Sequence, residues 1–203
     1  MKISHGELEA CRKSPKAWLA TKAEGGGNPR FSYNQALNYS IAELHKSADV
    51  TLALTRLNSY LKKFQDEKRK EMMRERLAAY ALWLKNSGVI PVDSNVTIAF
   101  PPTGDWRLGG WVSRVDVTST GYSAVLFGAI ASDWKAQLRM PLIQFAVAEK
   151  YGRPSSEIRV GFHDLDGNGT ADFRFPKAML DAALQEFIKV GNTVRKLDPG
   201  LFL

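Results

Sequence analysis

Residues 96–131 decide the fold, and they read VTIAFPPTGDWRLGGWVSRVDVTSTGYSAVLFGAIA. VTIAF (96–100) and WRLGGWVSRVDV (106–117) read as strands, because PPTGD and STG are turn sequences and the helical period is lost between them. Residues 122–131 are almost wholly apolar, which is typical of a central strand covered on both faces. The stretch therefore predicts three consecutive strands, with the third inside a sheet.

Helices and strands alternate after residue 131. The expected elements are a helix over 133–150, paired strands over 157–165 and 171–175, and a final helix over 176–194. Asp133 can cap the first helix, Pro141 should kink or restart it, and Pro176 opens the last one. This alternation predicts a protein of the α/β class.

The N-terminal half is expected to be mainly helical. Helices are predicted over 4–20 with a break near Pro15, over 32–47 with Ser32 as the N-cap, and over 50–85 as one long helix or two with a bend. GGGNPR (25–30) reads as a loop. The length of 203 residues indicates one domain, helical over 1–90 and built on the sheet over 91–203.

Composition indicates where the protein is located in the cell and which partners it favours. No run of about 20 apolar residues could cross a membrane, and the N-terminus lacks the apolar core of a signal peptide, so we expect a cytoplasmic protein. The single cysteine, Cys11, excludes an internal disulfide and an Fe–S cluster held by this chain alone. The net charge of +7 favours polyanionic partners such as nucleic acid.

The densest charge lies in residues 62–76, KKFQDEKRKEMMRER. One interpretation is a solvated helix face with internal pairs such as Asp66 with Lys70 and Glu71 with Arg74. The other is a basic ridge that follows a nucleic-acid backbone. Its candidate contacts are Lys62, Lys63, Lys68, Arg69 and Lys70, with Arg114 and Arg139 outside the run.

Four segments resemble, in order, motifs of the PD-(D/E)xK nucleases, in the branch of RecB-like and CRISPR-associated exonucleases. They are ISHGELEACRKSPKAWL (3–19), IAELHK (41–46), GWVSRVD (110–116) and QLRMPLIQFAVAEKYG (137–152). The resemblance implies a restriction-endonuclease-like core, a central mixed sheet flanked by helices, with DNA as the partner. It also places His45 at the metal-proximal histidine of the family and Asp116 at its first metal-binding aspartate.

The chain departs from this family where catalysis is concerned. The family's Asp/Glu-x-Lys would fall near Phe127 and Ala129, and neither side chain can bind a cation or orient water. The lesser departures are Ile41 for glycine, Ser113 for an acid, Pro141 for tyrosine and Gln144 for alanine. The catalytic motif is therefore missing from its usual place.

A shifted motif could replace it. Asp133 and Lys135 carry the D-x-K letters, and with His45 and Asp116 they would form a Mg²⁺ or Mn²⁺ centre. Structural interpretations compete with this one. Asp133 could be a helix cap, His45 a polar residue satisfied at the edge of the core, and Asp116 the partner of an arginine on its own strand.

A second cation signal is DLDGNGTAD (164–172), which resembles the first nine positions of a calcium loop. The oxygen ligands would come from Asp164, Asp166, Asn168 and Asp172. Phe175 stands where such a loop needs its glutamate, and Asp-Gly and Asn-Gly are common hairpin turns. We therefore expect a plain hairpin with at most weak Ca²⁺ binding.

Three functions follow from these patterns. The expected one is a catalytically impaired nuclease-fold subunit that binds DNA or joins a larger protein complex in DNA processing or antiviral defence. The alternatives are an active Mg²⁺- or Mn²⁺-dependent deoxyribonuclease with the shifted motif, and a protein–protein adaptor on a nuclease scaffold.

Overall fold

A computed structural model describes residues 1–24, 31–100, 105–167 and 169–202. The helices are α1 (Leu8–Lys13), α2 (Pro15–Ala23), α3 (Tyr33–Ser47), α4 (Val50–Leu61), α5 (Glu67–Ser87), α6 (Arg139–Tyr151) and α7 (Lys177–Leu197). The strands are β1 (Lys2–Ser4), β2 (Ile90–Phe100), β3 (Arg107–Thr118), β4 (Gly121–Phe127), β5 (Ile158–Asp164) and β6 (Gly169–Phe173). Short 3-10 turns are η1 (Trp134–Ala136), η2 (Ser155–Glu157) and η3 (Pro199–Phe202). The expected loop at 25–30, most of the turn at 101–105 and Asn168 lie outside the described residues.

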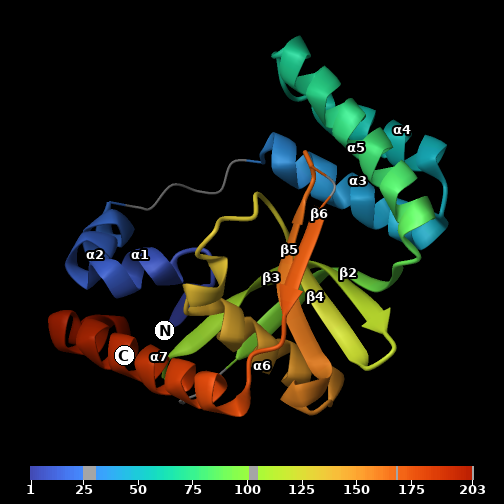
Figure 1. The fold of residues 1–203 in the computed structure, drawn as a ribbon. Coiled ribbons are helices and arrows are strands. Elements are labelled where there is room, and N and C mark those ends of the chain that lie inside the picture. The colour runs from blue at the N-terminus through green and yellow to red at the C-terminus, as the bar shows by residue number, and fades with distance from the viewer. Residues whose placement is uncertain (25–30, 101–104, 168, 203) are drawn as a thin grey trace.

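The strands form one mixed sheet with β3 as its longest member. Antiparallel β2 pairs along one side of β3, while parallel β1 and antiparallel β4 share the other side. β5 runs parallel to β4, and β6 returns antiparallel to β5. Helices lie on both faces of this sheet (Figure 1), which confirms the predicted α/β class.

Two layers of helices bury the two faces. α6 packs on one face, over a core that includes Val115, Ala124 and Phe162. α3 and α5 cover part of the other face, and α4 packs against them as the pair α4–α5 projects away from the sheet (Figure 1). α1, α2 and α7 close the end near β1, where Trp106 lies between Trp18 and Phe187.

The side chains of β2 and β3 change faces at one point along these strands. Asn95 adopts a left-handed conformation with φ 52°, which asparagine tolerates better than most residues. Ser94 consequently points towards α3, while Val96 joins the core under α6. A regular strand would place both on one face, because its side chains alternate. On β3 the same change leaves Val112 under α6 and Arg114 under α5.

The helical predictions hold better than the strand boundaries. Ser32 caps α3 in a capping box with Gln35, as predicted. The helical region at 50–85 is two helices, and the side chain of Asp66 caps the second. The strand predicted over 122–131 ends at Phe127, since its pairing with β5 stops there. β1 was not predicted, because three residues carry too little pattern to indicate a strand.

The helix predicted over 133–150 begins six residues later than expected, at Arg139. Asp133 precedes the short turn η1 and makes no capping hydrogen bond through its side chain. α6 begins at Arg139, so Pro141 lies in its first turn, where a missing N–H costs nothing. Of the helices that the structure describes, none is both long and apolar enough to cross a membrane.

Candidate functional site

A buried ion pair occupies the α5 face of the sheet at β3. Arg114 and Asp116 are 0% and 5% exposed, and Arg114 Nε lies 2.7 Å from Asp116 Oδ1 and 2.9 Å from Oδ2. The guanidinium carbon also lies 4.9 Å from the centre of the Trp83 ring on α5. Arg114 is therefore enclosed by a carboxylate and aromatic rings, and its burial rules out the predicted direct contact with DNA.

A chain of hydrogen bonds leads from this pair to α3. Arg114 Nη1 donates to the Tyr80 hydroxyl at 2.7 Å, and that oxygen lies 2.8 Å from His45 Nε2. His45 Nδ1 lies 2.5 Å from Ser94 Oγ. Arginine can only donate, so the Tyr80 hydroxyl accepts from Arg114, and its own proton is best used in a hydrogen bond to His45 Nε2. His45 is then the tautomer that carries its proton on Nδ1, and Nδ1 donates to Ser94.

Burial sets the protonation of this network at neutral pH. It lowers the pKa of His45 to about 3, with the positive charge of Arg114 as the second cause. It also lowers the pKa of His163, which lies under Trp83 and Tyr80, to about 4. Burial raises the pKa of Tyr80 to about 12 and that of Asp116 above its usual value, although Arg114 opposes the latter shift. Both histidines are therefore neutral, and Tyr80 keeps its proton.

These residues do not fit a catalytic metal. Both nitrogens of His45 are used in hydrogen bonds, and the Asp116 carboxylate faces Arg114 at ion-pair distance. The Phe127 ring, at the position where the sequence resemblance led us to expect an acid, packs 5.5 Å from that of Tyr80. Within the described ranges, no group of three or more His, Cys, Asp or Glu side chains could hold a metal ion.

The shifted motif lies on the other face of the sheet. Trp134 packs against Phe162 in the core under α6, and Lys135 Nζ lies 4.8 Å from the centre of the Phe173 ring. Asp133 is exposed beside them. The structure thus brings His45 near Asp116 through Tyr80, but it separates Lys135 from both. Arg139 is also on this face, against Phe162.

Two carboxylates of the calcium-like segment, Asp166 and Asp172, pair with arginines, and the third, Asp164, accepts from the backbone N–H of Asp166 at 3.0 Å. Asp166 receives two hydrogen bonds from Arg76 at 2.6 and 2.8 Å. Asp172 accepts from Ser123 and Arg159, both at 2.8 Å, and these contacts lower its pKa despite burial. Asn168 lies outside the described residues. The segment joins β5 to β6, so the predicted hairpin is confirmed.

The predicted basic ridge lies at the tip of the α4–α5 pair. Lys62, Lys63, Lys68 and Arg69 are exposed, whereas Lys70 is partly covered and paired with Glu67 at 2.7 Å. Of the two expected helix pairs, Glu71 with Arg74 forms, and Asp66 instead caps α5. Among the described residues, the tip therefore holds four cations without an ion-pair partner beside two ion pairs within α5.

Beneath these cations lies a cluster of rings that sequence reasoning missed. We call it the aromatic patch: Phe31, Tyr33, Tyr39, Tyr60 and Phe64. Arg56, Lys63 and Arg69 lie 5.0, 5.1 and 5.6 Å from the centres of the Tyr60, Phe31 and Tyr33 rings. The rings come from α3, from the residue before its cap, from α4 and from the connection between α4 and α5, so their sequence spacing gives no signal of the patch.

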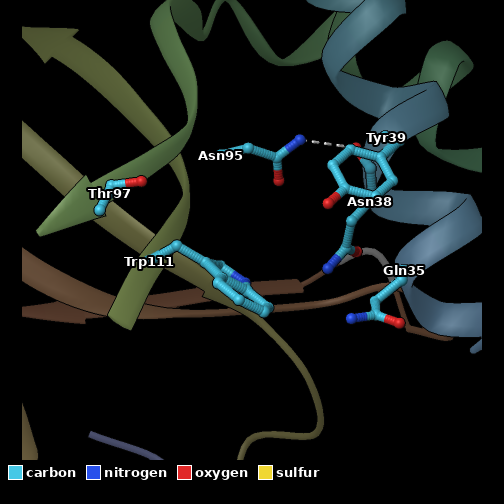
Figure 2. Close-up of a pocket in the computed structure, with 6 residues that line it drawn as sticks. All are labelled: Gln35, Asn38, Tyr39, Asn95, Thr97 and Trp111. Carbon is cyan, nitrogen blue, oxygen red and sulfur yellow. Dashed lines mark hydrogen bonds between the residues drawn. The ribbon is translucent and has the colours of Figure 1, made fainter. Parts of the chain in front are cut away.

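An open pocket adjoins the patch, between α3 and strands β2 and β3 (Figure 2). We call it the Trp111 pocket, and it is lined by Gln35, Asn38, Tyr39, Asn95, Thr97 and Trp111. Its volume is about 130 Å³. Trp111 and Thr97 are register partners and reach the α3 side because of the change of faces at Asn95. No pattern in the sequence indicated this pocket, because a regular alternation of side chains along β3 would place Trp111 on the opposite face.

Comparison with known proteins identifies a similar fold but no family. No family model and no curated protein matches this chain. The chain is similar to a crystal structure described as "Putative exonuclease" from Eubacterium rectale, with a TM-score of 0.55 and 9% identity over 92% of this chain and 75% of that one. A structure of SSO0001 aligns over 92% of this chain and 87% of that one, with 6% identity and a TM-score of only 0.32. The first likeness indicates that the chain has a nuclease-like α/β fold.

Proposed function

We propose that this protein binds DNA through a nuclease fold without cutting it efficiently, as a subunit in DNA processing or antiviral defence. One observation carries the proposal: the carboxylate at the family's metal-binding position is held by the buried guanidinium of Arg114. Phosphodiester hydrolysis on this fold needs cations held by carboxylates and a positioned water. A pair between Asp116 and Arg114 supplies neither.

Support for DNA as the partner comes from charge and fold together. The net charge is +7, and exposed cations gather at the tip of α4 and α5. Cations that neutralise phosphates release counterions, so such binding weakens linearly with the logarithm of salt concentration. The proposed role in DNA processing or antiviral defence comes from the resemblance to the PD-(D/E)xK branch. It is independent of the cations at the tip of α4 and α5.

Fluorescence anisotropy of a labelled oligonucleotide, titrated at several salt concentrations, tests the proposal. Replacing Lys62, Lys63, Lys68, Arg69 and Lys70 by glutamine should weaken binding and flatten the salt dependence by roughly one unit of slope per lost phosphate contact. The matched control replaces five exposed lysines elsewhere: Lys13, Lys16, Lys150, Lys189 and Lys196. Equal effects of the two sets, or no binding at low salt, would favour the adaptor function instead.

A further inference from the structure

Two of the residues that line the Trp111 pocket are half-exposed aromatic rings. Tyr39 on α3 is 45% exposed and Trp111 on β3 is 49% exposed. The close-up shows both rings bordering the same hollow, one from the helix and one from the strands (Figure 2). Large rings left half in water cost hydrophobic free energy, and an occupant that stacks on them recovers it.

The rest of the lining is polar and uncharged. Gln35, Asn38 and Asn95 contribute amides and Thr97 a hydroxyl. The Gln35 oxygen accepts from Ser32 N–H. Across the described part of the chain, the side chains of Asn38 and Thr97 make no hydrogen bond to protein, so they can serve a ligand. Amides offer donors and acceptors together, which suits a neutral planar ring with both kinds of group on its edge.

Size indicates one ring of a longer ligand. The pocket volume of about 130 Å³ is below the roughly 300 Å³ at which sites for whole small molecules begin. Tyr39 also continues into the aromatic patch, since its ring centre lies 6.2 Å from that of Phe31 and 5.9 Å from that of Tyr60. Lys63 and Arg56 cover those two rings, so positive charge follows the same path.

We propose that the Trp111 pocket takes an unpaired nucleobase from a single strand of nucleic acid, stacked against Trp111 and Tyr39, while the cations over the aromatic patch hold the neighbouring phosphates. This assignment rests on the proposed DNA binding and names its substrate form. Rings interleaved with cations are how proteins bind single strands without reading sequence, because every base has a stacking face. A paired base inside a duplex is unavailable to the pocket, so single strands are preferred.

The test compares two labelled single strands of equal length, (dT)15 and a fully abasic strand with the same phosphates. The intact protein should bind (dT)15 more tightly than the abasic strand. Trp111→Ala should weaken (dT)15 binding by about 5- to 150-fold, the value of roughly 1–3 kcal/mol per stacked base, and leave abasic binding unchanged. Val117→Ala, a change at another exposed residue of the same strand, is the matched control and should alter neither.

Each other outcome has a distinct meaning. If neither strand binds, the proposed DNA binding fails and the pocket assignment with it. If both strands bind equally and Trp111→Ala changes nothing, DNA binding stands and the pocket assignment is overturned. An equal loss for both strands in Trp111→Ala would mean that the ring contacts the sugar–phosphate chain, which also overturns it. Thr97→Val adds a second variant at an exposed position and should weaken (dT)15 binding alone.

Discussion

Arg114 and Asp116 lie two residues apart on β3 and form a buried ion pair, with Arg114 Nε 2.7 Å from Asp116 Oδ1. Two residues apart on a strand share a face, so this geometry is inherent in the sequence RVD once the strand is regular there. The guanidinium of Arg114 neutralises the negative charge of the Asp116 carboxylate. A second, divalent cation at the same carboxylate would have to displace Arg114 from a site in which Tyr80 also holds it.

Removing the carboxylate should destabilise the protein strongly. Asp116→Ala leaves the Arg114 charge buried without its partner, and such a change costs about 3–5 kcal/mol. Urea unfolding measures the loss. The control is Asp181→Ala, which breaks the exposed pair with Lys177, where Lys177 is 86% exposed, and should cost at most about 1 kcal/mol. Equal, small losses in both variants would show that the Arg114 pair contributes little.

Acid should destabilise the protein below about pH 6.5. The folded pKa values of His45 and His163, about 3 and about 4, lie below the ordinary value of 6.5. The unfolded chain therefore binds protons first, and each histidine removes about 1.4 kcal/mol of stability per pH unit between its two values. Asp116 opposes the trend as the pH approaches its raised pKa, because its folded carboxyl then takes up a proton first.

Urea midpoints at pH 7.0 and 5.5 measure this dependence. His45→Gln should shrink the difference between the two pH values, whatever it does to stability at pH 7.0, because it removes one of the titrating groups. A wild-type midpoint that is the same at both pH values would contradict the burial of neutral histidines described for this site.

Introducing the acid and lysine that the sequence resemblance implies should not create a metal site. In the double variant Phe127→Glu with Ala129→Lys, the introduced carboxylate lies on the Tyr80 side, near Arg114. Arg114 Nη2 is buried and has no hydrogen-bond partner among the described residues, so it is the natural partner for that carboxylate. Mn²⁺ should leave the melting temperature unchanged, whereas binding at 100 times Kd would raise it by about 5–10 °C.

Single substitutions at the tip of α4 and α5 should differ in their effect on DNA binding. Lys62→Gln should lower the salt slope by roughly one unit if its exposed charge meets a phosphate. Lys70→Gln should change it little, because Lys70 is already paired with Glu67. Anisotropy titrations at four salt concentrations give both slopes. The reverse order would mean that the Lys70–Glu67 pair opens when DNA binds.

The fold was predictable because its signals are local. The capping box at Ser32, the apolar run before Phe127 and the hairpin turn after Asp164 each specify an element within a few residues. The sheet order was not, since β1 gains its place only by pairing with β3, about 100 residues away. Strand pairs that distant carry no periodic signal of their own.

The site was less predictable for a physical reason. His45 and Asp116 were singled out by resemblance, but Tyr80, which joins them, reads as one more apolar helix position. The Trp111 pocket depends on the change of faces at Asn95, because one irregular residue decides which side every following side chain takes. Nothing in the alternation of WRLGGWVSRVDV indicates that reversal.

The most direct test of the account is a native gel of a labelled single-stranded oligonucleotide incubated with the intact protein and Mn²⁺, with the strand length then read on a denaturing gel. We predict a retarded band that contains the full-length strand, since we propose that the protein binds DNA and the Asp116 carboxylate is held by Arg114. Shortened products that the intact protein forms with Mn²⁺ but not with EDTA would contradict this claim.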